Sequence, residues 1–319
     1  MTLSKLSRRE ALAKAGSLAG AALFADSFLA QKAHANEPAA GTTAQFRFCL
    51  NTSTLRGQKL GIVKDIEIAS KAGYEGIEPW MDGLTAYIEA GGKLSDLRKQ
   101  ITDSGLVLED AIGFAEWIVD DEARRAKGLD LAKRQMDMLS QLGGKRIAAP
   151  PAGATALPKL DLLTCAERYR VLLEAGQQFS IVPQLELWGF SQNLNHLGEC
   201  VCVAMETGHP NACVLADVFH LYKGGSNLGG IQMLGPKAIQ VLHMNDFPTD
   251  IPRDKLQDNL RVYPGEGQGP VKEILRLLRQ TGGQKILSLE LFNREYWKQD
   301  ALEVAKRGLA SMKAVVQSL

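Results

Sequence analysis

Residues 212–243 read ACVLADVFHLYKGGSNLGGIQMLGPKAIQVLH and contain two short apolar runs, at 212–215 and 238–243. The segment between them, about 228–235, is predicted to be helical. Short apolar runs bounded by turn residues are typical of buried strands. Two strands joined through a helical crossover predict a parallel pair, which is the repeating unit of α/β folds.

The same alternation continues along the chain. We predict strands at 46–50, 76–78, 106–112, 146–149, 184–187, 212–215, 238–243 and 285–291. Helices are predicted at about 60–72, 93–104, 124–142, 158–179, 194–207, 228–235, 269–281 and 299–317. Eight strands alternating with eight helices over ~270 residues predict a single-domain (β/α)8 TIM barrel over residues 46–319. A doubly wound open sheet is disfavoured because residues 51–57, after the first strand, are not a glycine-rich phosphate loop.

The composition is that of an ordinary globular protein, with 319 residues of which 45% are hydrophobic and 23% charged. No apolar run beyond the N-terminal region is long enough to span a bilayer, so we expect no membrane-spanning segment. The cysteines are odd in number and lack the spacing of a disulfide framework or a zinc ribbon: Cys49, Cys165, Cys200, Cys202 and Cys213. We therefore expect buried free thiols.

The N-terminus has the features of a secretion signal. Arg8 and Arg9 precede a mildly apolar run at 15–30 and an Ala-x-Ala end at 33–35. The arginine pair resembles bacterial twin-arginine signals, which predicts a signal peptide at 1–35, a flexible leader at 36–45 and a periplasmic or otherwise exported protein. The alternative is a disordered or amphipathic N-terminal segment of a cytoplasmic protein. Without the first 35 residues the chain is slightly acidic, which gives no indication of a nucleic-acid partner.

Four consecutive predicted strands end in a residue that can bind a metal: Glu186, Asp217, His243 and Glu290. Glu186 and Glu290 each lie between two leucines, and a buried carboxylate is unfavourable unless it is paired or coordinates a cation. Each residue alone has a structural alternative: an ion pair, a helix cap at Asp217, or a core histidine. Their occurrence at the same ends of successive strands indicates one site. Three carboxylates and one imidazole favour Mn²⁺ or Mg²⁺, with Co²⁺ or Zn²⁺ as alternatives.

The order Glu, Asp-x-x-His, His, Glu on these strands resembles the xylose-isomerase-like superfamily of sugar isomerases and epimerases, which includes D-tagatose 3-epimerase and inosose dehydratase. The segment GYEGIE at 73–78 also resembles the second strand of this superfamily. The resemblance covers about residues 46–317. It implies that the four strand-end residues bind one divalent metal, for which Mn²⁺ is the first expectation.

The resemblance also implies substrate contacts from His220 and from Arg261, which precedes a Pro-Gly-x-Gly turn. Their structural alternatives are a polar residue that opens a loop and a solvated arginine, and Arg253 competes with Arg261. Two departures leave the reaction open. Gln192 stands where the epimerases carry another glutamate, and the stretch between His243 and Arg261 is longer than in the simple epimerases.

Several other residues near the predicted strand ends have two readings. Glu78 and Glu109 are either extra polar contacts or ion pairs of the barrel. Aromatic residues near the strand ends either stack on a sugar ring or pack in the core: Trp80, Phe114, Trp117, Trp188 and Phe292.

We expect an enzyme that acts on a keto-sugar or related polyol. A divalent cation stabilises an enediolate, and Glu186 and Glu290 are the candidate catalytic residues that remove and return the proton. Return of the proton on the opposite face gives epimerisation. Return on the same face, or at a neighbouring carbon, gives isomerisation. Loss of a β-substituent makes the same site a lyase or a dehydratase.

Several alternatives remain beside the isomerase or epimerase. An exported keto-glycoside lyase or hydratase is the runner-up, because phosphorylated sugars are largely intracellular. A sugar-binding protein with a non-catalytic barrel is the alternative of another class. A DNA-repair relative such as endonuclease IV needs a three-zinc cluster with many histidines, which this chain does not supply. The expected partner is a small carbohydrate, with no nucleic acid, and a homo-oligomer is left open.

Overall fold

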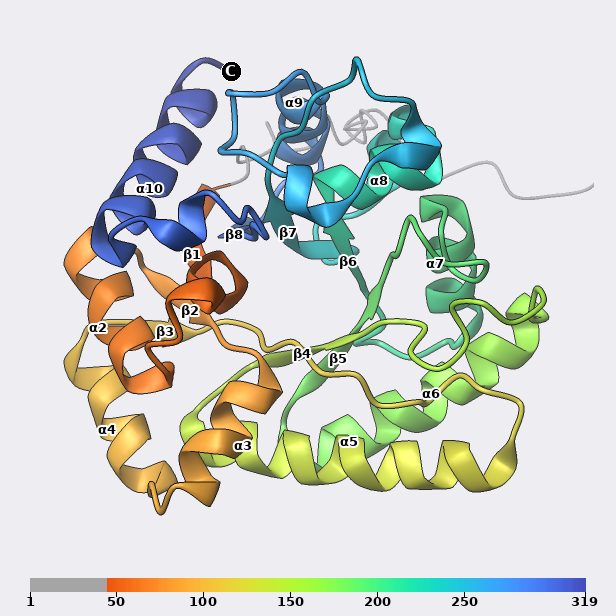
Figure 1. Cartoon of the computed structure of the whole chain (residues 1–319). Helices are drawn as coiled ribbons and strands as arrows, with labels where there is room; N and C mark the ends of the chain where they lie inside the picture. Colours follow the sequence, from red (N-terminus) through yellow and green to blue (C-terminus); the bar gives the residue numbers. More distant parts are fainter. Residues whose placement is uncertain (1–44) are drawn as a thin grey trace, which may run out of the picture. The chain divides into compact units, whose positions relative to one another are not determined.

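The computed structural model describes residues 45–319, so the predicted signal peptide at 1–35 and residues 36–44 of the leader lie outside the described residues. Parallel strands form one 8-stranded sheet in the order β3-β2-β1-β8-β7-β6-β5-β4 (Figure 1). The strands are β1 Gln45–Asn51, β2 Gly76–Glu78, β3 Val107–Leu108, β4 Arg146–Ala149, β5 Val182–Glu186, β6 Val214–Asp217, β7 Ile239–Met244 and β8 Gln284–Leu289. With helices between successive strands, this arrangement confirms the predicted (β/α)8 barrel.

The sheet is least regular where β3 faces β4. The predicted strand at 106–112 is regular only at 107–108. The Asp110 side chain accepts the Ala111 N–H at 2.9 Å, which takes this donor out of the strand ladder. The Ala111 carbonyl still accepts the Ala148 N–H of β4 at 2.8 Å, so the two strands meet across this edge.

Helices surround the curled sheet (Figure 1). The α-helices are α2 Ile62–Ala72, α3 Met81–Glu89, α4 Leu94–Asp103, α5 Glu122–Leu142, α6 Leu162–Phe179, α7 Leu197–Glu206, α8 Val218–Gly224, α9 Val271–Gln280 and α10 Ala301–Gln317. Short 3-10 helices are η1 Thr52–Gln58, η2 Leu228–Met233, η3 Arg253–Lys255, η4 Asp258–Leu260 and η5 Tyr296–Lys298.

The crossover after β6 differs from the prediction. The sequence predicts a helix at about 228–235, but this segment is the 3-10 helix η2, because Gly229 and Gly230 disfavour an α-helix. The α-helix is α8, which the sequence does not predict and which begins directly after the strand. Its N-cap is Asp217, whose Oδ1 accepts the His220 N–H at 2.9 Å. Helix α3 is likewise absent from the prediction.

Ordinary end signals set the bounds of the long helices. The Asp121 side chain accepts the Arg124 N–H at the start of α5, and Gly143 with φ 80° ends this helix in the left-handed region. The Asp161 side chain caps α6 by accepting the Thr164 N–H. These local signals fix where each helix meets its strand.

The barrel interior is polar at both ends and apolar between them. Close to the strand starts, Glu109 pairs with Arg47 at 2.9 Å and Lys145 at 3.1 Å. Glu109 is therefore a structural ion-pair residue. One layer further along the strands is apolar, formed by Cys49, Ile112, Ala148, Leu215, Val241 and Ile286. Beyond this layer, buried polar side chains gather at the carboxyl ends, where the active sites of such barrels lie.

Two further expectations concern the whole barrel. All five cysteines are free, and Cys202 alone among them is not fully buried, which confirms the prediction of unpaired thiols. Within residues 45–319 there is no helix with both the length and the apolar character that a membrane crossing requires.

Candidate active site

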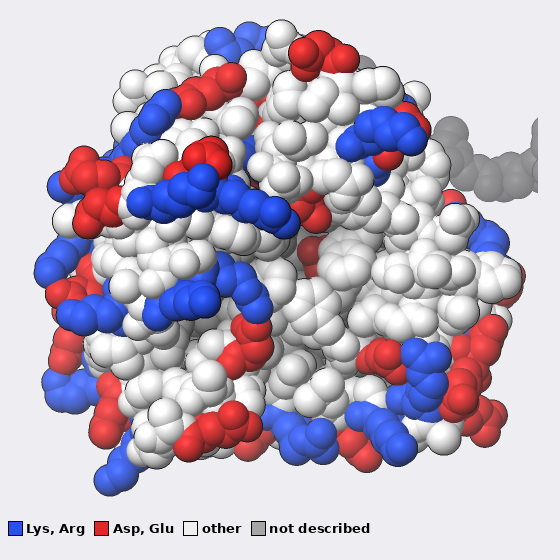
Figure 2. Space-filling model, in the orientation of Figure 1, with Lys and Arg blue, Asp and Glu red and all other residues white. Residues whose placement is uncertain are grey.

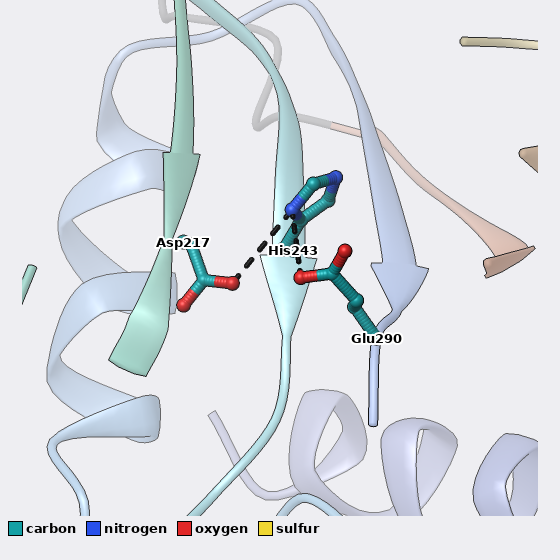
Figure 3. Close-up of side chains that lie close together, drawn as sticks. All are labelled: Asp217, His243 and Glu290. Carbon is teal, nitrogen blue, oxygen red and sulfur yellow. Dashed lines mark ion pairs between the residues drawn. The ribbon is translucent and has the colours of Figure 1, made fainter. Parts of the chain in front are cut away.

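Asp217, His243 and Glu290 come together at the carboxyl ends of β6, β7 and β8 (Figure 3). One potential ligand atom of each lies within 4.8 Å of the others. His243 Nδ1 is 3.2 Å from Glu290 Oε2 and 3.7 Å from Asp217 Oδ2. The strand register explains the meeting, because it pairs Asp217 with His243, and His243 with Ser288, two residues before Glu290.

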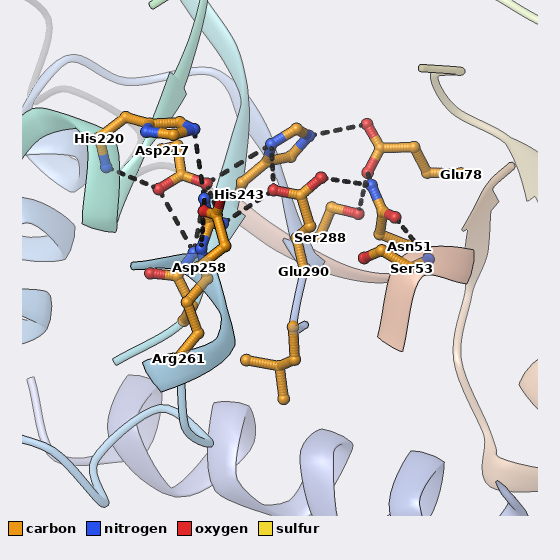
Figure 4. Close-up of polar contacts among 12 residues, drawn as sticks. Asn51, Ser53, Glu78, Asp217, His220, His243, Asp258, Arg261, Ser288 and Glu290 are labelled. Atoms are coloured by element: carbon orange, nitrogen blue, oxygen red, sulfur yellow. Dashed lines mark hydrogen bonds and ion pairs between the residues drawn. The ribbon is translucent and has the colours of Figure 1, made fainter. Parts of the chain in front are cut away.

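Glu78, at the end of β2, fixes the orientation of His243 (Figure 4). Glu78 Oε1 lies 2.9 Å from His243 Nε2, and Glu78 Oε2 accepts the Asn51 amide at 2.8 Å and the Ser288 hydroxyl. Burial opposes ionisation of Glu78, but His243, Ser288 and Asn51 outweigh it and lower its pKa. The carboxylate therefore accepts from Nε2–H, and Nδ1 is left facing Asp217 and Glu290. A metal-binding histidine usually has such a partner on its other nitrogen.

The electrostatics of His243 suit a cation at Nδ1. Burial lowers the pKa of His243, but the charges of Glu290 and Glu78 raise it well above its usual value. Nδ1 is buried and has no hydrogen-bond partner of good geometry among the described residues. A divalent ion at this atom would replace the proton and face the same carboxylates. The residues present thus fit a divalent cation.

Arg261 also reaches this cluster. Its Nη1 donates to Asp217 Oδ2 at 2.7 Å and to Glu290 Oε2 at 2.9 Å, and its Nη2 donates to Asp258 at 2.6 Å (Figure 4). The side chain is 1% exposed, which excludes the alternative of a solvated loop arginine. Burial would lower the pKa of Arg261, but the three carboxylates raise it, so the guanidinium stays charged.

The loop that follows β7 brings Arg261 into the site. Asp246 and Val262 form an antiparallel bridge, with N–H to carbonyl bonds of 3.0 and 2.8 Å. The Asp246 side chain accepts the N–H groups of Gly265 and Gly269. A Cβ at Gly267 would lie 2.5 Å from Asp246 Oδ1, so this position requires glycine. The loop therefore folds back over the barrel mouth, instead of extending into solvent.

Glu186 lines the same pocket, but its ligand atoms lie outside the compact group of Asp217, His243 and Glu290. Its Oε2 is buried and has no hydrogen-bond partner in the part of the chain that the structure describes. Burial raises the pKa of Glu186 to about 8, and the charges of Glu290 and Asp217 add to the effect of burial while His243 opposes it. Glu186 therefore lines the pocket with a carboxyl group that has one oxygen without a partner in the described residues.

His220 lies beside Arg261, at 3.2 Å from Nη2 to Nε2. Burial lowers the pKa of His220 to about 4, with Asp217 opposing and Arg261 adding to the shift. The imidazole is therefore neutral. Because Arg261 donates to Nε2, we assign the proton to Nδ1, which is buried and without a partner among the described residues. His220 thus lines the pocket and carries an N–H that has no partner in the described residues.

The pocket over these residues has a volume of about 440 Å³. Its polar lining comes from Glu186, His220, Asp258, Arg261 and Glu290. Its other walls come from Trp80, Ile112, Phe114, Thr155, Ala156, Trp188, Phe190 and Phe292. Figure 2 shows the face hollowed near its centre, with red atoms visible inside the hollow, white surface on its right and blue and red side chains along its left edge.

The remaining sequence candidates lie elsewhere. Trp117 is 2% exposed and packs on Tyr169 with its N–H on the Pro150 carbonyl, so it belongs to the core. The Arg253 guanidinium lies over the Tyr222 ring at 4.7 Å and does not line the pocket. Asp258, Asn51 and Phe190 join the site without any prediction from the sequence, because their strands and loops carry no motif that marks them.

The protein is thus a (β/α)8 barrel with a candidate metal centre. The centre is the buried cluster of carboxylates and an imidazole at the carboxyl ends of the strands. The family model described as "Xylose isomerase-like TIM barrel" matches residues 66–315, so the chain belongs to this family.

Two curated relatives cover different chemistries. An inosose isomerase of Bacillus velezensis is 27% identical over 277 residues, which are 85% of this chain and 97% of the relative. A 3-dehydroshikimate dehydratase of Pseudomonas putida is 24% identical over 250 residues, which are 77% of this chain but 38% of the relative. Among solved structures, the IolI protein with a bound zinc atom has a TM-score of 0.80 at 24% identity and covers 85% of this chain and 98% of that one. The relatives of this chain thus include an isomerase and a dehydratase.

Proposed function

We propose that the protein is a divalent-metal-dependent isomerase or epimerase of a keto-sugar or related polyol. The observation that carries the proposal is the cluster of Asp217, His243 and Glu290 beside a pocket into which Glu186 offers an unpartnered oxygen. These four residues would hold the ion, and their oxygen-rich donor set suits Mn²⁺, with Mg²⁺, Co²⁺ or Zn²⁺ as alternatives. When bound, such an ion supplies Lewis acidity toward substrate oxygens.

Glu186 is the residue that we assign first to proton transfer. Its Oε2 has no competing donor in the described residues, so it is free to take the proton from the carbon beside the carbonyl. Burial raises the pKa of Glu186 to about 8, so the metal-free carboxyl is mostly protonated at pH 7, and the positive charge of a bound cation would favour the ionised form that accepts the proton. Glu290 is the second proton carrier. Its oxygens face Asn51 at 3.3 Å and Arg261 at 2.9 Å, which hold it in one orientation.

His220 and Arg261 orient the substrate in this proposal. The neutral His220 would donate from Nδ1 to a hydroxyl or carbonyl oxygen. Arg261 would stabilise negative charge that develops on a substrate oxygen, with its guanidinium held by Asp258, which is not one of the four proposed ligands.

The direct test is hydrogen exchange in D₂O with purified, Mn²⁺-supplemented protein and a panel of keto-sugars and inososes. We expect deuterium at the carbon next to the carbonyl in at least one of them, and no exchange after treatment with a chelator. The matched variant Glu186→Gln should lose the exchange. A protein that binds a divalent ion but exchanges no deuterium into any of these compounds would contradict the proposal and favour the sugar-binding alternative.

Elimination by the same site is the second candidate. The dehydratase relative supports it, because loss of a β-substituent starts with the same removal of a proton next to a carbonyl. Incubation with a keto-glycoside separates the two functions. Release of the aglycone identifies a lyase, whereas deuterium uptake with an intact glycosidic bond identifies an epimerase or isomerase.

We also propose that residues 1–35 direct export and are removed, which rests on the arginine pair and the Ala-x-Ala end alone. Expression of the full chain in a bacterium with an active twin-arginine route should place the mature protein in the periplasm. Arg8→Lys together with Arg9→Lys should leave it in the cytoplasm uncleaved. Light scattering of the purified protein tests whether it is a homo-oligomer.

A further inference from the structure

Aromatic rings form a nearly continuous wall around the candidate active site. Trp80 lies 5.8 Å from Phe292 and 5.3 Å from Phe114 between ring centroids, and Phe114 lies 5.9 Å from Trp188. Phe190 extends the wall past His220, whose ring is 5.4 Å away. We call the rings of Trp80, Phe114, Trp188, Phe190 and Phe292 the aromatic arc.

The arc and the polar groups occupy different parts of one pocket. The charged and imidazole groups that line the pocket are buried, apart from Asp258, whose side chain is 39% exposed. In contrast, Phe114 is 38% exposed and Phe190 is 39% exposed, although both line this pocket. Large exposed apolar side chains in a concave site mark a binding surface more often than a packing defect. The exposure of Phe114 excludes the core-packing alternative that the sequence left open for it.

The arc is larger than a sugar ring alone requires. A single monosaccharide presents few apolar C–H groups, which one aromatic side chain covers, and its hydroxyls need polar partners. Phe114 and Phe190 offer no hydrogen bond to a hydroxyl, whereas the buried polar residues can serve the sugar end. The pocket volume of about 440 Å³ lies in the range of sites for ligands larger than a simple sugar. The rings therefore fit a second, apolar and planar part of the ligand.

We propose that the substrate is a glycoside-like compound with an aryl substituent, which binds against the exposed faces of Phe114 and Phe190 while the sugar end lies over Glu186 and the metal cluster. This inference rests on the proposed function for the position of the sugar end. It deepens that function by naming the substrate class. Aromatic rings about 5 Å apart prefer tilted or offset contacts. Phe114 and Trp80 already make such a contact, with an interplanar angle of 52°.

Calorimetric titration with two matched probes tests the inference. We expect the wild-type, Mn²⁺-supplemented protein to bind phenyl β-D-glucopyranoside roughly tenfold or more tighter than methyl β-D-glucopyranoside, since only the first offers a ring to the arc. Phe114→Ala and Phe190→Ala should each reduce this preference severalfold without weakening binding of the methyl compound. Leu163→Ala, which removes an exposed apolar side chain on α6 outside the pocket, is the control and should leave the preference unchanged.

Equal affinity for the two probes, binding of neither, or a preference that survives both phenylalanine substitutions would overturn the inference. The deuterium-exchange assay on small keto-sugars separates this failure from failure of the proposed function. If deuterium exchange occurs but the phenyl compound binds no tighter than the methyl compound, the proposed isomerase or epimerase stands and the aryl substrate is refuted. If the phenyl compound binds tighter but no deuterium exchange occurs, the aromatic arc is supported as an aryl-binding surface and the catalytic proposal is refuted.

Discussion

Glu78→Gln is the substitution that best tests whether Glu78 orients His243 in the candidate metal site. Glu78 makes three contacts: with His243 Nε2 at 2.9 Å, with the Asn51 amide at 2.8 Å and with the Ser288 hydroxyl. All three partners donate to a carboxylate, and glutamine has only one oxygen to offer. If this oxygen stays on His243, the new amide N–H₂ faces the amide of Asn51.

Asn51 cannot turn over to relieve this contact without a loss. Its Oδ1 already accepts the N–H of Trp80 at 2.9 Å and of Ser53 at 2.9 Å. The variant therefore either places the glutamine and Asn51 amide N–H groups against each other or breaks the two hydrogen bonds that Asn51 Oδ1 accepts. Either change costs about 1–3 kcal/mol in a buried site. The neutral amide oxygen of glutamine is also a weaker acceptor for Nε2–H than a carboxylate, and this makes Nδ1 a weaker ligand. We expect Mn²⁺ affinity to fall 10- to 100-fold, as for other partners of metal-binding histidines.

The assay is competition for Mn²⁺ between the metal-free protein and a fluorescent chelator at pH 7.5. Glu109→Gln is the matched control, because Glu109 is equally buried in the barrel but pairs with Arg47 and Lys145 close to the strand starts. It should lower the free energy of unfolding without changing Mn²⁺ affinity. Wild-type affinity in Glu78→Gln, or an equal loss in Glu109→Gln, would refute the orienting role of Glu78.

Three further substitutions have outcomes that the contacts define. Arg261→Met should destabilise the metal-free protein by about 3–5 kcal/mol, because it removes the buried guanidinium that pairs with both Asp217 and Glu290. Mn²⁺ should then raise its Tm more than it raises that of the wild type, and an unchanged metal-free Tm would argue against this pairing. Glu186→Gln should abolish deuterium exchange. It should weaken Mn²⁺ binding less than Asp217→Asn does, because Glu186 lies outside the compact cluster. A larger loss of Mn²⁺ affinity in Glu186→Gln than in Asp217→Asn would instead make Glu186 the principal ligand. Asp65→Asn should stabilise the protein at pH 8 by up to about 4 kcal/mol but not near pH 4, because burial raises the pKa of Asp65 from 3.8 to about 7. A group with a raised folded-state pKa contributes stability below its unfolded value and loses it as the pH rises toward 7, so a pH-independent effect in denaturant unfolding would contradict this account.

The sequence predicts the barrel well because the patterns that indicate its strands and helices are formed by neighbouring residues. Apolar runs of strand length and helices that end at glycine, as at Gly73 and Gly143, are properties of neighbouring residues. The strand-end positions of Asp217, His243 and Glu290 follow from the same reasoning, since the ends of adjacent parallel strands meet. The errors are also local in origin. The helix predicted at 228–235 is a 3-10 helix, and the crossover helix α8 starts earlier, where the cap Asp217 also serves the site.

What the sequence by itself determined is therefore the fold, and the side chains that a parallel barrel must bring to one end. Only the tertiary structure decided which atoms meet. Glu78 and His243 are separated by 165 positions and touch because the strands β2 and β7 face each other across a closed barrel. Arg261 reaches the cluster because Asp246 folds a long loop back, and Glu186 keeps one oxygen without a hydrogen-bond partner among residues 45–319. Such contacts depend on the closure of the barrel and on loop paths, which no local pattern encodes.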